Sequence, residues 1–310
     1  MRLLSASIQV GVKGDQFIDT LTGQPLMLAG SHTWNNVQRI NGRTVGLDAV
    51  AGNFTRLWTI ETKAADFSQS IWGSTSPGVQ QIKDGPFTED GTLNGGYYRR
   101  LEDVVRRAEK RDIVTGVVLF EGSIQGIFPG AWENHPFNGS GPTRHQDIHN
   151  RGHWNALQRE HVQRVAETLE PYGNVIYEVG NELARESTRW FQPKVVEWVQ
   201  KFTNKPVGVS YASAVYRDQS WMERSDADFI VPGNGTRAGG VRKLPGFKGP
   251  QILDTDHAWP LYSNVAGLSI ASEQGRPLWL MDGLDGSVLR NQQSLAPDRA
   301  FIDGIATLAG

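Results

Sequence analysis

Eight short apolar runs, separated by helical or long polar segments, constrain the fold of this 310-residue chain more than any other feature. They cover residues 25–30, 53–60, 113–120, 174–180, 205–211, 227–233, 250–256 and 276–282. Continuous apolar character of this kind is typical of strands that are covered on both faces, as in a parallel sheet. Strands that alternate with helices favour such a sheet, and eight of them predict a (β/α)8 barrel.

An open, doubly wound sheet is the competing architecture. It would need a glycine-rich phosphate-binding turn after the first strand, but that segment reads AGSHTWNN and lacks the G-x-G-x-x-G pattern. No internal repeat, low-complexity tract or linker divides the chain, so we expect one barrel domain over residues 1–310. A short N-terminal hairpin, turning around Thr22-Gly23, is expected to precede the first strand.

Helical periodicity is clearest in residues 97–111, where Leu101, Val104, Val105 and Ala108 share one face. Further helices are expected around residues 154–169 and 191–202. The three helical segments follow the second, third and fourth apolar runs, as a (β/α)8 barrel requires.

Charge and cysteine content exclude several classes of function. The net charge is -2, so no basic field exists to hold nucleic acid or an anionic membrane. No apolar run approaches the roughly 20 residues that span a bilayer. With no cysteine, disulfides, thiolate metal ligands and a cysteine nucleophile are all excluded. The N-terminal segment does not read as a signal peptide, which fits either a cytoplasmic chain or one secreted after processing.

Polar, aromatic and acidic residues gather where the predicted strands end. In a barrel these ends form the active-site face, so the pattern predicts an acidic, tryptophan-lined cleft. Any one acid alone could be a helix cap or a surface charge, but that explanation does not account for the whole set. The residues expected to bind substrate are His32, Trp34, Arg56, Trp58, Glu121, Asn181, Tyr211, His257 and Trp259.

The fourth strand carries the sharpest signal. In NVIYEVGNEL, side chains alternate, so Glu178, Gly180 and Glu182 share the face that points into a barrel, with Glu182 at its mouth. This segment resembles the strand-four signature of the clan-A (β/α)8 glycoside hydrolases. The resemblance implies that Glu182 is the general acid/base and that Asn181 bonds to a sugar hydroxyl.

A wider resemblance covers residues 15 to 285. The segments LFEG, HPFN, NVIYEVGNE, DTDHAW and LWLMDG resemble, in that order, a group of bacterial cellulase-like and apiosidase-like hydrolases. The resemblance implies a carbohydrate substrate, no cofactor and retention of anomeric configuration. It also matches Arg56 to the strand-two arginine of the clan, which helps to hold the nucleophile.

The seventh strand departs from the clan, which normally has a glutamate nucleophile there. Here only Asp254 and Asp256 are available, and both fall on one face. An aspartate can act as nucleophile, because a carboxylate attacks the anomeric carbon whichever stem carries it. We rank Asp256 first, Asp254 second and Asp282, at the end of the eighth strand, third. His257 points the other way and is expected to brace the following loop.

Two further functions stay open from the sequence. A carbohydrate-binding pseudoenzyme would explain the missing strand-seven glutamate. A metal-dependent barrel hydrolase could use His257 and Asp282, but that class commonly needs paired histidines after the first strand, where only His32 occurs. The spacing of His145, His149 and His153 would align three ligands on a helix, yet the segment is rich in turn residues, so we expect no metal site. The oligomeric state and the identity of the sugar are left open.

Overall fold

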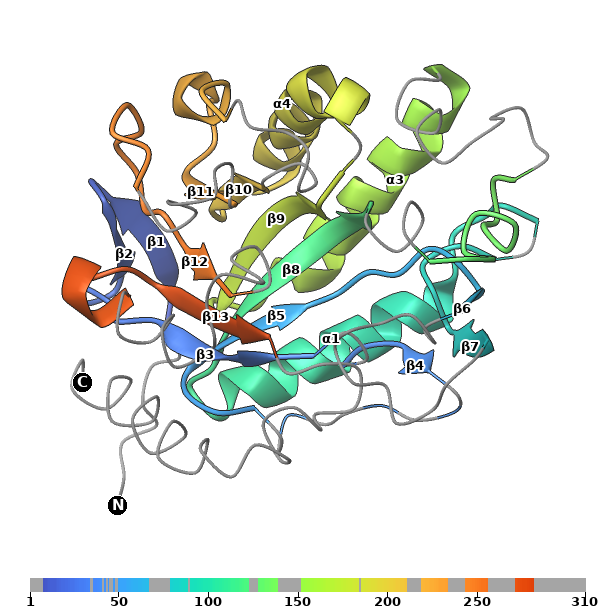
Figure 1. The fold of residues 1–310 in the computed structure, drawn as a ribbon. Coiled ribbons are helices and arrows are strands. Elements are labelled where there is room, and N and C mark those ends of the chain that lie inside the picture. The colour runs from blue at the N-terminus through green and yellow to red at the C-terminus, as the bar shows by residue number, and fades with distance from the viewer. Residues whose placement is uncertain are drawn as a thin grey trace.

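The computed structural model describes residues 8–33, 36–40, 42, 44, 47, 50–66, 79–88, 90–122, 128–138, 152–183, 185–210, 219–233, 243–255 and 271–281. These residues form an α/β fold in which parallel strands lie inside and helices lie outside (Figure 1). The predicted α/β class and its parallel pairing are therefore confirmed. None of the helices in these ranges is long and apolar enough to cross a membrane.

Two parallel sheets contain the eight predicted strands. One has the order β11-β10-β9-β8-β5 and the other the order β12-β13-β3. Each strand lies within or overlaps one of the apolar runs. Their bounds are β3 (Ala29–His32), β5 (Phe54–Leu57), β8 (Val114–Glu121), β9 (Val175–Asn181), β10 (Val207–Ser210), β11 (Phe229–Val231), β12 (Leu253–Asp254) and β13 (Leu278–Met281).

Main-chain hydrogen bonds link the two sheets at both of their edges. Beside β11, the amide of Ile252 donates to the carbonyl of Ile230 at 2.9 Å. Beside β5, the amide of Asn53 donates to the carbonyl of Ala29 at 3.0 Å. The described strands nevertheless form two sheets and not one continuous closed sheet, so the closed barrel stays a proposal.

An apolar cluster fills the space between the two sheets. Trp279 of β13 packs against Phe54 of β5 with ring centroids 4.8 Å apart. A Cβ atom on Gly116 would lie 2.3 Å from the Trp279 ring, so only glycine leaves room for the indole at this point. The members of the cluster are Val10, Phe17, Leu28, Phe54, Val114, Ile176, Phe229, Val231, Ile252 and Trp279.

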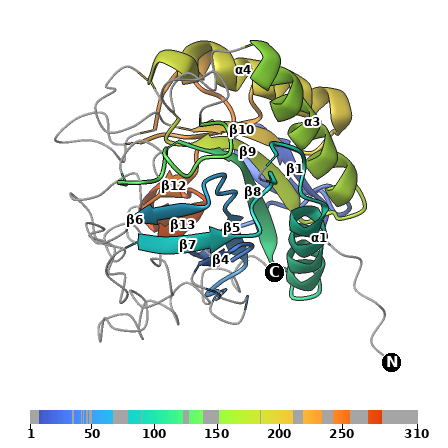
Figure 2. The same ribbon diagram turned by 90° about the vertical axis from the view of Figure 1, so that its right-hand side faces the viewer.

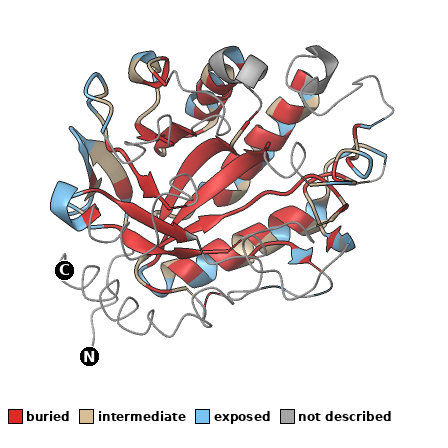
Figure 3. Ribbon diagram, viewed as in Figure 1, coloured by how far each residue is buried: buried red, intermediate tan, exposed pale blue. Residues whose placement is uncertain are grey.

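Three helices cover the outer face of the five-stranded sheet (Figures 1 and 2). They are α1 (Gly95–Glu109), α3 (Gly152–Leu169) and α4 (Arg185–Phe202). The α1 helix begins where the side chain of Asn94 accepts a hydrogen bond from the amide of Gly96, and its buried face holds Leu101 and Val105. The central strands β8 and β9 are buried along their whole described length (Figure 3).

The N-terminal segment makes two turns, and the sequence predicted the second of them. The segment pairs β1 (Val10–Lys13) with β2 (Gln16–Asp19), and the first turn is Gly14-Asp15, where Gly14 adopts a φ of 61°. Thr22-Gly23 forms a second turn, closed by a bond from the amide of Gly23 to the carbonyl of Asp19. An antiparallel bridge joins Ile18 to Pro25, and the amide of Leu26 donates to the carbonyl of Phe17 at 2.8 Å. The predicted turn at Thr22-Gly23 therefore connects two antiparallel segments, while the pairing of β1 with β2 before it was not predicted.

A small antiparallel sheet was not expected. It has the order β4-β7-β6 and consists of β4 (Arg39–Ile40), β6 (Ala64–Asp66) and β7 (Val79–Lys83). A short 3-10 helix, η3 (Met222–Arg224), lies between β10 and β11. These elements lie outside the two parallel sheets.

Candidate active site

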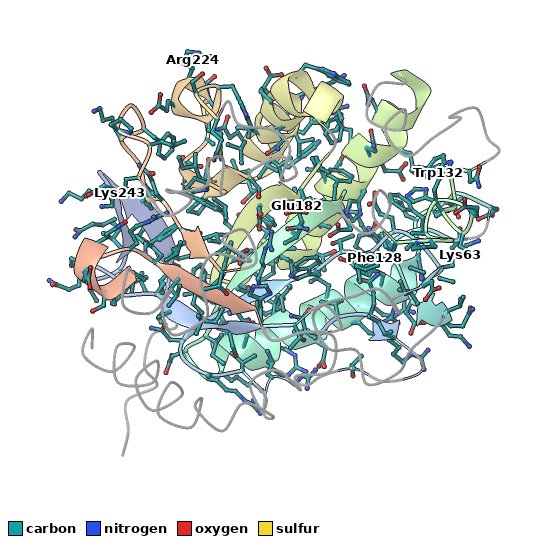
Figure 4. All side chains as sticks on the ribbon, in the orientation of Figure 1. Lys63, Phe128, Trp132, Glu182, Arg224 and Lys243 are labelled. Atoms are coloured by element: carbon teal, nitrogen blue, oxygen red, sulfur yellow. The ribbon has the colours of Figure 1, made fainter. Side chains whose placement is uncertain are left out.

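Seven of the predicted site residues lie in the described part of the chain, at the carboxyl ends of parallel strands from both sheets. They are His32, Arg56, Trp58, Glu121, Asn181, Glu182 and Asp254. Figure 4 labels Glu182 at the end of β9, among side chains from the neighbouring strands. The remaining candidates, Trp34, Tyr211, Asp256, His257, Trp259 and Asp282, lie outside the described residues, as do His145, His149 and the side chain of His153.

Arg56 is the buried centre of the site. Its Nε and Nη2 atoms donate to the two carboxylate oxygens of Glu178 on β9, at 2.7 and 2.6 Å. Its Nη1 atom donates to Asp254 Oδ2 on β12, at 3.0 Å. One guanidinium therefore joins carboxylates from the two sheets, and the fork geometry fixes the direction of both.

Aromatic rings enclose this arginine. Its Cζ atom lies 4.8 Å from the ring centroid of Trp58 and 5.4 Å from that of Trp279. Both indoles are buried, so the cation sits between apolar faces that exclude water. Trp58 therefore supports the arginine from the interior of the protein.

His32 lies between Trp58 and Asp254 and contacts both. The indole nitrogen of Trp58 donates to His32 Nδ1 at 3.3 Å, and His32 Nε2 lies 3.5 Å from Asp254 Oδ1. Burial lowers the pKa of His32, although the Asp254 carboxylate acts in the opposite direction. Because indole only donates, the neutral imidazole carries its proton on Nε2, facing Asp254. Asp254 is thus held from two sides, by Arg56 and by His32.

The side-chain amide of Asn181 has a fixed orientation. Its oxygen accepts a hydrogen bond from Arg56 Nη2 at 2.9 Å, while its nitrogen donates to Glu121 Oε1 at 3.5 Å. Glu121 in turn donates its backbone amide to Glu61 Oε2 at 3.1 Å. A polar chain therefore runs from the arginine through Asn181 to two further carboxylates.

Glu182 follows β9 directly and leaves the strand direction sharply. Its φ of 44° lies in the left-handed region, which is uncommon for a residue with a Cβ atom. The neighbouring Gly122 allows this turn, because a Cβ atom there would lie 2.6 Å from the Glu182 carbonyl oxygen. Glu182 is half-buried and directly follows Asn181, the last residue of β9.

Burial and the charge of Glu121 raise the pKa of Glu182 to about 7. The Asp254 carboxylate adds to this increase, and Arg56 opposes it. A carboxyl group with such a pKa keeps a large fraction of its protons at neutral pH, so it can donate one to a leaving group. Arg56 holds the carboxylates of Glu178 and Asp254 in fixed positions nearby. The site therefore combines a protonated carboxyl group, Glu182, with carboxylates at the same end of the strands.

Three residues of this network, Glu61, Glu178 and Trp279, were not predicted as site residues. Glu178 was placed on the inner face by strand alternation, but its pairing with Arg56 requires the register between β5, β8 and β9. Trp279 was expected only as part of an apolar strand. Within the described residues, no group of three or more histidine, aspartate or glutamate side chains is arranged to hold a metal ion.

No protein-family model and no curated protein matches the chain. Solved structures do share its fold. A β-glucanase from Saccharophagus degradans, in complex with cellotetraose, is 12% identical, and the match covers 99% of this chain and 95% of that one with a TM-score of 0.54.

Two further structures are similar at the same level. Endo-glycoceramidase II from a Rhodococcus species, as its lactosyl-enzyme intermediate, is 14% identical over 84% of this chain and 73% of that one, with a TM-score of 0.54. A glycoside hydrolase family 5 mannosidase from Rhizomucor miehei is 11% identical over 90% and 86%, with a TM-score of 0.53. The resemblance to this group of glycoside hydrolases is therefore confirmed for the fold.

Proposed function

We propose that this chain is a retaining glycoside hydrolase that cleaves O-glycosidic bonds of an oligo- or polysaccharide. The observation that carries the proposal is Glu182: a carboxyl group with a pKa near 7, next to Asn181, at the same strand ends as Asp254 and Arg56. Glycoside hydrolysis needs one protonated carboxyl group and one carboxylate on either side of the scissile bond. The fold shared with glycoside hydrolases supports the same reading.

The proposed architecture is one closed (β/α)8 barrel that forms a single domain. The hydrogen bonds between β11 and β12, and between β3 and the segment before β5, support it by joining the two sheets at both edges. The shared interior cluster supports it as well, because it takes residues from both sheets. A barrel brings all eight carboxyl ends to one mouth, where a sugar would bind.

In the proposed mechanism, Glu182 donates its proton to the glycosidic oxygen as the bond from that oxygen to the anomeric carbon breaks. An aspartate carboxylate attacks the anomeric carbon from the opposite face and forms a glycosyl ester. Glu182, now ionised, then takes a proton from water, whose oxygen displaces the aspartate. The sugar leaves with its original configuration, and both carboxyl groups return to their starting states.

Asp256 is the proposed nucleophile. Asp254, the last residue of β12, is buried and held by Arg56 and His32, which suits a residue that orients its neighbours. Two residues further along a strand is roughly 6.5 Å nearer the mouth, where Glu182 also emerges. Asp254 and Asp282 are the alternatives. A mechanism-based fluoro-sugar that labels Asp256 would support this assignment. A label on Asp254 or Asp282 would show that the labelled residue is the nucleophile instead.

The test of the function is a panel of aryl glycosides and polysaccharides, with the anomeric configuration of the first product read by proton NMR. We expect hydrolysis with retention. In Glu182→Gln, turnover of substrates with poor leaving groups should fall at least about 100-fold, and azide should partly rescue Glu182→Ala on an activated aryl glycoside. Glu167→Gln, an exposed change on α3, is the matched control. Full activity of Glu182→Gln, or inversion of configuration, would contradict the mechanism.

The missing strand-seven glutamate favours one other candidate, a carbohydrate-binding pseudoenzyme. It would bind an oligosaccharide from the same panel without hydrolysing it, and Glu182→Gln would bind as tightly as the wild type. The metal-dependent alternative gains no support from the described donor groups.

A further inference from the structure

Glu121 and Glu182 lie at the ends of the neighbouring strands β8 and β9, whose register is fixed by the parallel ladder. Glu121 pairs directly with Asn181 in the parallel ladder of β8 and β9. The amide of Gly122 donates to the Asn181 carbonyl at 2.9 Å, one residue further along. Because Gly122 also abuts the Glu182 carbonyl group, the chain segments 121–122 and 181–182 cannot separate without breaking the ladder.

Two hydrogen bonds, from the backbone amide and to the carboxylate, fix the position of Glu121. Its backbone amide bonds to Glu61 Oε2, and its Oε1 atom accepts the hydrogen bond from Asn181. Both carboxylates are buried. Among the described residues, the charged groups that shift the pKa of Glu182 are Glu121 of β8, Arg56 of β5 and Asp254 of β12.

The one cation in this set is already committed. Arg56 bonds to both oxygens of Glu178 and to Asp254, so its charge is shared between these two carboxylates. It is linked to Glu121 through the neutral amide of Asn181. Glu121 raises the pKa of Glu182, because a neighbouring negative charge in a buried site disfavours ionisation of the second carboxyl group.

We propose that Glu121 is a positioning residue for the general acid: its fixed carboxylate keeps the proton on Glu182. The proposal rests on the proposed function and adds a third carboxyl group to the two that hydrolysis requires. The nucleophile loses its charge when the glycosyl ester forms, but Glu121 does not. Glu121 therefore keeps a negative charge beside Glu182 in both halves of the reaction.

The test is Glu121→Gln in the full chain. Glutamine keeps the volume and the oxygen that accepts from Asn181, but it removes the charge. The Glu182 side chain is titrated by carbon-13 NMR on protein labelled at the glutamate carboxyl carbon, with Glu182→Gln used to assign its signal. We expect the pKa of Glu182 to fall by about one unit, a typical effect of a single neighbouring charge. The basic limb of the kcat/KM profile should move down by the same amount.

Two further variants separate this effect from a change in structure. Glu121→Asp keeps a charge on a shorter stem, so most of the wild-type pKa should return. Glu167→Gln removes a charge from exposed α3 and should leave the pKa of Glu182 unchanged.

An unchanged pKa in Glu121→Gln, with the fold intact by circular dichroism, would overturn the proposal. The NMR titration needs no substrate, so it decides the role of Glu121 even if the substrate panel yields no hydrolysis. That second failure would count against the proposed function alone.

Discussion

At the scale of single residues, the site depends on a buried cation shared by two carboxylates. Removing one member of such a network leaves the others charged and unpaired, which is more damaging than losing the pair as a whole. Arg56→Met should therefore lower the free energy of unfolding by about 3–5 kcal/mol, measured by urea unfolding at pH 7. Adding Glu178→Gln to this variant should recover part of the loss, because one of the orphaned charges disappears.

The matched control is Arg106→Met. Arg106 pairs with Asp103 on the surface of α1, where both side chains are nearly half exposed, so the change should cost less than about 1 kcal/mol. A loss in Arg56→Met as small as that of the control would show that the buried network contributes little.

Glu182 links stability to pH. Its pKa is raised from 4.5 to about 7 by folding, so the folded chain binds more protons than the unfolded chain in that interval. The stability that the protonated form provides is complete below pH 4.5 and is lost as the pH rises through 7. Glu182→Gln should therefore exceed the wild type in Tm by about 2–4 °C at pH 8, and nearly match it at pH 4.5.

Differential scanning calorimetry at the two pH values checks this prediction, with Glu167→Gln as a variant that should show no such pH dependence. A wild type more stable than Glu182→Gln at pH 8 would mean that the ionised carboxylate is stabilised in the fold. That result would also remove the reason for assigning Glu182 as the acid.

At the scale of secondary-structure elements, the contact of Gly116 on β8 with Trp279 on β13 joins the two sheets. Gly116→Ala places a Cβ atom where the indole lies, and overpacking of this kind should cost about 1–3 kcal/mol in urea unfolding. The loss should be smaller when Trp279→Phe is also present, because the smaller ring leaves space for the methyl group.

Gly95→Ala is the control for Gly116→Ala. At the start of α1, the nearest atom is the end of the Arg99 side chain at 3.5 Å, so alanine should be neutral or slightly stabilising. If the two alanine variants are equally stable, or if Trp279→Phe brings no relief, the close packing between the sheets is wrong.

The strands could be predicted because burial on both faces makes them read as apolar runs, and all eight overlap their predicted positions. The pairing of Arg56 with Glu178 could not be predicted, because strand alternation shows on which face a side chain lies but not which side chain of another strand it contacts. The turn at Thr22-Gly23 was predicted, but the earlier pairing of β1 with β2 was not, because each of these strands has only four residues. The sheet of β4, β6 and β7 has strands of two to five residues, too short for a periodic signal.

At the scale of the whole molecule, the site and the hairpin lie at opposite ends of the strands. The amide of Val10 bonds to the carbonyl of Gly173, just before β9 begins, whereas Glu182 follows its end. Phe17 of the hairpin packs edge-on against Phe54 and Phe229, with ring centroids 6.4 and 5.5 Å away. The hairpin therefore closes the interior cluster at the end of the strands opposite to the candidate site.

Because the hairpin and both sheets contribute side chains to the same interior cluster, we expect the chain to unfold as a single unit. Calorimetric and van't Hoff enthalpies should agree, and tryptophan fluorescence should follow the same curve as circular dichroism, because Trp279 and Trp58 lie in the interior while the helices dominate the dichroism. Phe17→Ala should lower the stability by about 3–5 kcal/mol and move both curves together. Leu21→Ala, at an exposed position beside the same hairpin, should move neither. Separate transitions for the two signals in Phe17→Ala would mean that the hairpin or one sheet unfolds alone, and the single-domain barrel would then be wrong.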